Sequence, residues 1–198
     1  MSNTIHILLI SGSTRGASTN TATLRTAEVV APDGVSARLF GAMMDLPYFN
    51  PDEDPAGAAP GEVRLPYPAV VTLRVAIAAS HAVLFCTPEY AGALPGSFKN
   101  LLDWCVGGGE MSRKPAAWIN VSSMPTGAAD AHASLAKVLG YLDADVVSAA
   151  CVRLPVGRSA VGGTGLIADA AIRAGIADVL ATLAAHCRGR DGESPRLE

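Results

Sequence analysis

Residues 5–34 read IHILLISGSTRGASTNTATLRTAEVVAPDG, and this stretch decides the fold. The short apolar run at residues 5–10 predicts a strand, which ends at a polar turn that begins with Ser11 and Gly12. Good helix formers at residues 18–31 then predict a helix that ends before Pro32. A strand, a tight loop and a helix in this order are typical of an α/β domain.

The rest of the chain repeats this alternation. We expect strands at residues 35–40, 82–87, 116–121 and 146–153, and helices at 95–106, 130–142 and 167–187, with one more helix between the second and third strands. Right-handed crossovers would place these helices on both faces of a doubly wound, five-stranded parallel sheet. Residues 45–68 are rich in proline, glycine and acid, which predicts an irregular surface segment.

Composition limits the possible functions. The formal net charge is −3 and only 17% of residues are charged, so no surface for nucleic acid or an anionic membrane is expected. The N-terminus lacks the basic and apolar regions of a signal segment, which predicts a cytoplasmic protein. The cysteines and histidines show no metal-ligand spacing, so no metal site is expected. We expect one domain at residues 1–188 and a flexible tail at 189–198.

Ligands of such sheets bind beyond the carboxyl ends of the strands, where three loops should meet. The first loop, SGSTRGASTN, combines hydroxyls, glycines and an arginine with a helix N-terminus, whose unpaired amides favour an anion. It lacks the signatures of triphosphate and dinucleotide loops, which favours a phosphomonoester. An ordinary turn capped by Ser18 is the alternative. The candidate phosphate ligands are Ser13, Thr14, Arg15, Ser18, Thr19 and Asn20.

The second loop, TPEYAG, follows a buried strand and is suited to a flat heteroaromatic ring. Its backbone amides can meet the polar rim of such a ring while apolar side chains cover one face. The third loop, VSSMPTG, adds hydroxyls that can meet the same polar edge. A solvated acid beside a surface aromatic residue is the alternative for the second loop. The candidate ring-binding residues are Pro88, Glu89, Tyr90, Ala91, Gly92 and Ser122.

Two patterns in these loops resemble the NADPH-dependent FMN reductase family, which is flavodoxin-like and related to quinone, azo-dye and chromate reductases. They are G-S-x-R-x-x-S-x-N at residues 12–20 and T-P-E-Y-x-x-x-x-P-G-x-x-K-N-x-x-D-W at residues 87–104. The resemblance implies strand order 2-1-3-4-5 and a homodimer or tetramer. It also implies that the first loop holds the FMN phosphate and that residues 88–91 and Ser122 line the isoalloxazine. Ala91 replaces the asparagine that is frequent after the tyrosine.

The resemblance further implies an oxidoreductase that passes electrons from NADPH or NADH through bound FMN to a small acceptor, such as a flavin, quinone, azo compound or metal oxyanion. The flavin carries the electrons, so no catalytic side chain is expected. Two alternatives stay open. One is a flavin-binding electron-transfer module without nicotinamide turnover, and the other is a flavin-free regulatory domain on the same fold.

Overall fold

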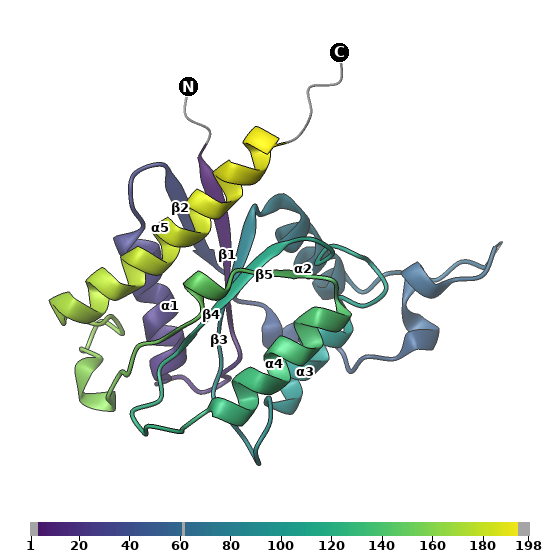
Figure 1. Cartoon of the computed structure of the whole chain (residues 1–198). Coiled ribbons are helices and arrows are strands. Elements are labelled where there is room, and N and C mark those ends of the chain that lie inside the picture. The colour runs from purple at the N-terminus through teal and green to yellow at the C-terminus, as the bar shows by residue number, and fades with distance from the viewer. Residues whose placement is uncertain (1–3, 61, 194–198) are drawn as a thin grey trace.

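The structure is a computed structural model that describes residues 4–60 and 62–193. Its strands are β1 (Ile5–Ser11), β2 (Val35–Leu39), β3 (Ala82–Cys86), β4 (Pro115–Asn120), β5 (Asp145–Val146) and β6 (Val152–Arg153). They form one parallel sheet in the order β2-β1-β3-β4-β5, and β6 also pairs with β4 (Figure 1). This arrangement confirms the predicted doubly wound sheet and its strand order.

Helices cover both faces of the sheet. They are α1 (Thr19–Val30), α2 (Pro68–Ala79), α3 (Gly96–Asp103), α4 (Ala129–Tyr141) and α5 (Ala170–Glu193). Successive side chains of a strand point to opposite faces, so each face has its own apolar cluster. Leu9 and Leu84 pack with α1 and α5, whereas Leu8 and Phe85 pack with α2, α3 and α4 (Figure 1). All of β3 is buried, which explains its unbroken apolar sequence.

The single strand predicted at residues 146–153 is wrong, because β5 and β6 replace it. Both pair with β4, in the registers Ala116 with Val146 and Ile119 with Val152. From the first pair to the second, β4 advances by three residues, whereas the segment that runs from β5 to β6 advances by six. The surplus residues coil into a single 3-10 turn at Ser148–Ala150. This detour leaves the end of β6 beside the end of β4, near the three predicted loops.

Helix α5 extends beyond the end expected from the sequence. Near its end, Arg190 Nη1 donates a hydrogen bond to Asp145 Oδ2 at 2.7 Å. The helix therefore includes the first residues of the segment 189–198 for which we predict flexibility, and residues 194–198 lie outside the described chain. Among the described helices, α5 alone is long and apolar enough to cross a bilayer, by length and composition. In this fold its apolar side chains have another role, because the sheet buries Ile176, Leu180, Leu183 and Ala184.

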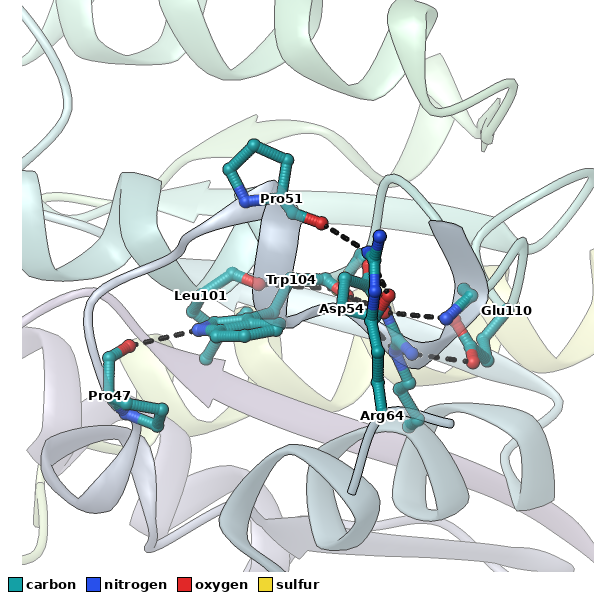
Figure 2. A network of polar contacts seen from close by, with 10 residues as sticks. Pro47, Pro51, Asp54, Arg64, Leu101, Trp104 and Glu110 are labelled. Atoms are coloured by element: carbon teal, nitrogen blue, oxygen red, sulfur yellow. Dashed lines mark hydrogen bonds and ion pairs between the residues drawn. The ribbon is translucent and has the colours of Figure 1, made fainter. Parts of the chain in front are cut away.

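The segment 45–68 is irregular, as predicted, and its described residues include two short 3-10 turns, Pro51–Glu53 and Pro55–Gly57. It is fastened to the helices by one buried carboxylate. Asp54 is 3% exposed and its Oδ2 accepts a hydrogen bond from Arg74 Nη2 at 2.8 Å (Figure 2). Arg74 also donates to the carbonyl oxygen of Trp104, whose indole nitrogen donates to the carbonyl oxygen of Pro47 at 2.9 Å. The segment is thus anchored at two points although it lacks regular structure.

Candidate functional site

Three loops at the carboxyl ends of β1, β3 and β4 surround a cavity of about 410 Å³, which we call the strand-end cavity. Its volume falls in the range of small-molecule sites. Five predicted site residues line it, namely Thr19, Asn20, Pro88, Glu89 and Ser122. The other lining residues are Thr87, Val121, Ser123, Met124, Gly127, Ala128, Val156 and Arg158. The sheet therefore brings all three predicted loops to one cavity.

The first loop lies against β3 because residue 12 is glycine. The amide of Gly12 donates a hydrogen bond to the carbonyl oxygen of Cys86 at 2.9 Å. A Cβ atom on Gly12 would overlap Thr87 Oγ1 and would come within 2.9 Å of the ring of Phe98. Any side chain at this position would therefore push the loop away from the strand-end cavity.

Ser18 is the N-cap of α1, because its hydroxyl accepts a hydrogen bond from the amide of Thr21. The capped turn that the sequence left as an alternative is therefore present. It occupies one amide only. The backbone amides of residues 16–19 donate no hydrogen bond to any group within the described residues. These amides and the positive end of the helix dipole remain available to an anion.

Asn20 points its side chain toward β3. Its Oδ1 accepts a hydrogen bond from Cys86 Sγ at 3.3 Å, and the residue is buried. Burial raises the pKa of the Cys86 thiol far above its ordinary value, so the thiol stays protonated and is not a nucleophile. The side-chain nitrogen Nδ2 of Asn20 donates to no described residue. It is therefore available to a ligand in the strand-end cavity.

Glu89 uses its carboxylate to cap helix α4. Its Oε2 accepts hydrogen bonds from the amides of Asp130 and Ala131 at 3.0 and 3.1 Å. The N-cap residue of α4, Ala128, has no side chain that could do this. The partly exposed carboxylate is therefore committed to the helix, whereas Tyr90 is the surface aromatic residue of the alternative reading. Glu89 thus lines the strand-end cavity while its carboxylate caps α4.

The next residues form a tight hairpin turn. Tyr90 and Ala93 exchange two backbone hydrogen bonds of 3.1 Å. Between them, Ala91 and Gly92 both have positive φ, at 51° and 72°, as a type I′ turn requires. Glycine and asparagine adopt this conformation readily, whereas alanine is strained there. The positive φ therefore explains why asparagine is frequent at the position of Ala91, in addition to the hydrogen bonds that its side chain can make.

The third loop is held by hydrogen bonds of its own. Asn120 accepts from the amide of Ser122 at 2.9 Å, and the Ser122 hydroxyl accepts from the amide of Met124 at 3.3 Å. Arg153, on β6, donates to the carbonyl oxygens of both Ser122 and Met124. A Cβ on Gly127 would overlap the Ser122 hydroxyl, so a side chain there would displace that hydroxyl. These contacts fix Ser122 in the wall of the strand-end cavity.

A second cavity of about 370 Å³ adjoins the first, and we call it the arginine cavity. The two cavities share Thr19 and Arg158. The arginine cavity contains the predicted residues Arg15 and Ser18 together with Gly16, Ala17, Thr21, Ala22, Arg25, Val161, Gly162, Gly163 and Gly165. Five predicted residues line neither cavity, namely Ser13, Thr14, Tyr90, Ala91 and Gly92.

Residues 156–165 and Arg25 also contribute to the two cavities, although neither was predicted from the sequence. Residues 156–165 follow β6 and cross the same edge of the sheet, bringing Arg158 to the junction of the two cavities. A signal was present, because the segment VGRSAVGGTG follows a strand and resembles the first loop in its glycines, hydroxyls and single arginine. Arg25 gave no such signal, because it lies inside a helix.

One histidine lies behind the strand-end cavity. His132 Nδ1 donates a hydrogen bond to the carbonyl oxygen of Ala128 at 2.6 Å, and its buried Nε2 has no partner among the described residues. Burial lowers the pKa of His132 below its ordinary value, so the ring is neutral near pH 7. Within residues 4–60 and 62–193, no group of three or more His, Cys, Asp or Glu residues is placed to hold a metal.

Comparison with known proteins identifies the family. The sequence profile described as NADPH-dependent FMN reductase matches residues 5–157. The chain belongs to this family. Membership makes it an oxidoreductase that uses FMN and a reduced nicotinamide, which confirms the enzyme class and cofactors expected from the two loop patterns.

Relatives across bacteria agree with this assignment. The chain is 34% identical over 171 residues to an NAD(P)H-dependent FMN reductase of Pseudomonas aeruginosa, covering 85% of this chain and 88% of the relative. It is 30% identical over 172 residues to a quinone reductase of Pseudomonas putida, covering 85% and 84%. These family members therefore match nearly the whole chain and carry names for two different acceptors.

Solved structures of other proteins share the fold. The flavoenzyme NAD(P)H:(acceptor) oxidoreductase FerB of Paracoccus denitrificans is 26% identical, with a TM-score of 0.69 over 92% of this chain and 98% of that one. An azoreductase of Bacillus anthracis, at 14% identity, has a TM-score of 0.54 over 95% and 99% of the two chains. The latter likeness concerns the fold alone.

Proposed function

We propose that this FMN reductase family member passes electrons from a reduced nicotinamide through bound FMN to a small acceptor, in one pocket. The observation that carries the proposal is the pair of adjoining cavities at the strand ends, one beside unpaired helix amides and arginines and the other between three loops. A flavin mononucleotide needs such a pair, because it joins a phosphate to a flat ring system.

The residues present fit FMN. The amides of residues 16–19, with Arg15 and Ser18, provide donors for a phosphate, and we propose that Ser13, Thr14, Thr19 and Asn20 complete this end. Pro88, Glu89 and Ser122 line the strand-end cavity, and we propose that they hold the isoalloxazine. Tyr90, Ala91 and Gly92 follow directly in the chain, and we propose that this hairpin covers the ring.

The chain contributes binding and orientation. When bound, FMN supplies the acceptance of a hydride and the delivery of electrons. The loops fix the ring, restrict water and leave room for a planar partner to stack. Glu89 and Cys86 are committed to internal hydrogen bonds, so neither is offered as an acid or base. We therefore assign no catalytic side chain.

We further propose an acceptor such as a flavin, quinone, azo compound or metal oxyanion, and assembly into a homodimer or tetramer. Large apolar side chains on the outside of the segment 45–68 support assembly, because Tyr48, Val63 and Leu65 are 93%, 86% and 84% exposed. Light scattering of the purified protein measures the assembly state. Cell fractionation tests the proposed cytoplasmic location.

The function is tested by mixing the FMN-loaded protein with NADPH or NADH without oxygen. The absorbance of the bound flavin should bleach with at least one donor and return when a quinone is added. A bound flavin that neither donor bleaches would indicate an electron-transfer module instead. A colourless protein that does not bind FMN in a fluorescence titration would indicate a flavin-free domain.

A further inference from the structure

Three arginines converge on the arginine cavity. Arg15 comes from the first loop, Arg25 from the second turn of α1, and Arg158 from the segment that follows β6. The side-chain nitrogen Nη1 of Arg25 reaches across to that segment, because a Cβ on Gly165 would lie 3.4 Å from it. The cavity is therefore lined by two parts of the chain that are more than 130 residues apart.

These three cations have no counterion in the fold. No acidic residue lines the arginine cavity, and within the described residues none of the three guanidinium groups makes a hydrogen bond or an ion pair. Other arginines of the chain are paired, for example Arg74 with Asp54 and Arg190 with Asp145. A chain of net charge −3 thus concentrates three unpaired positive charges around one cavity.

The chemistry of the cavity selects its ligand. Guanidinium groups bind phosphate oxygens through paired, charge-assisted hydrogen bonds. A phosphomonoester carries a charge of about −1.5 to −2 near neutral pH, which one arginine does not balance. The volume of about 370 Å³ also leaves room for a phosphate together with the sugar or ribityl carbons attached to it.

We propose that Arg25 and Arg158 complete, with Arg15, a binding site for the phosphomonoester of a redox cofactor. The inference rests on the proposed function and adds two arginines from outside the predicted phosphate loop. The group has two possible sources, the 5′-phosphate of FMN and the 2′-phosphate of NADPH. Both present the same dianion to the arginines, and they are separated by experiment.

The test uses two matched ligand pairs, each differing by a phosphate. The full chain, freed of flavin, is titrated with FMN and with riboflavin, and the FMN-loaded protein is titrated with NADP⁺ and with NAD⁺, which transfer no hydride to the flavin. The variants are Arg25→Ala and Arg158→Ala. Arg38→Ala is the matched control, because Arg38 lies exposed on β2 and lines neither cavity.

We expect each cavity variant to bind the phosphorylated member of one pair at least about tenfold more weakly. Its affinity for the unphosphorylated member should stay within about twofold of wild type. Loss of FMN but not riboflavin binding assigns the site to the flavin phosphate. Loss of NADP⁺ but not NAD⁺ binding, with FMN binding intact, assigns it to the electron donor and gives the enzyme a preference for NADPH.

Two results would overturn the inference. One is that both variants bind all four ligands with wild-type affinity. The other is that a variant loses affinity equally for both members of a pair, which would mean that the arginines only support the loop. Either result leaves the proposed function standing if the wild-type protein binds FMN and a nicotinamide bleaches it. Failure of that wild-type reaction would instead refute the proposed function itself.

Discussion

Glu89 Oε2 lies 3.0 Å from the backbone nitrogen of Asp130, although 41 positions separate the two residues. This hydrogen bond ties the loop after β3 to the start of α4 across the strand-end cavity. We predict that Glu89→Ala lowers the free energy of unfolding by about 1 kcal/mol, because helix caps contribute this amount. Urea unfolding followed by circular dichroism measures the change. Glu89→Gln keeps an acceptor oxygen and should lose less, and an equal loss in both variants would contradict the capping role.

Ala91 is strained, and its replacement should stabilise the protein. Its φ of 51° is unfavourable for alanine, whereas glycine adopts it freely. Glycine relieves this strain, but it also makes the unfolded chain more flexible, which opposes the gain. The net expectation is that Ala91→Gly raises the free energy of unfolding by about 0.5–1 kcal/mol. Ala93→Gly, in the same turn but without positive φ, is the control and should lower it. Stabilisation by Ala93→Gly, or none by Ala91→Gly, would refute the account of the turn.

His132 should make stability depend on pH below neutrality. Its pKa is lowered by burial, so the unfolded chain binds a proton more readily than the folded one. The contribution to stability is complete above the unfolded pKa of about 6.5 and is lost as the pH falls through the lower folded value. We expect the free energy of unfolding to decline from pH 7 to pH 5, by at most about 1.4 kcal/mol per pH unit from this group. His132→Gln should reduce the change of unfolding free energy with pH. An unchanged pH dependence would mean that another group causes it.

Asp54 should be required for the attachment of the segment 45–68. Its buried carboxylate pairs with Arg74 at 2.8 Å (Figure 2). Removing it leaves the partly buried Arg74 with the longer ion pair to Glu110, at 3.6 Å, as its remaining charged contact. We predict that Asp54→Ala costs about 3 kcal/mol of unfolding free energy. The pair of Glu62 and Arg64, whose carboxylate side chain is 41% exposed, is the comparison, and Glu62→Ala should have a much smaller effect. Similar losses in both variants would mean that the buried pair has no special role.

Tyr90 tests the proposed ring-covering hairpin. Its side chain is half exposed and lines neither cavity, so we expect Tyr90→Ala to fold normally and to keep its affinity for the FMN phosphate. The kinetics with a quinone acceptor should change, because the covering of the ring is altered. Tyr90→Phe retains the aromatic surface and should resemble wild type. Steady-state kinetics of Tyr90→Ala identical to wild type would count against the proposed role.

The sequence predicted what depends on local pattern and on sheet topology. The apolar runs located β1 and β3, and the rule that ligands bind at strand ends placed Thr19, Pro88 and Ser122 at one cavity. It did not predict contacts that depend on tertiary packing. The carboxylate of Glu89 is drawn to α4 by unpaired amides 41 residues away, and Arg158 enters the site because β6 returns to the edge of β4. Neither relation leaves a periodic trace in the sequence.

The two walls of the arginine cavity come from distant parts of the chain, so the proposed phosphate site would depend on both. One wall lies before residue 26 and the other after residue 157, so a folding chain lacks half of this cavity until residues 158–165 reach the sheet. A ligand that binds only the closed cavity stabilises only the finished domain.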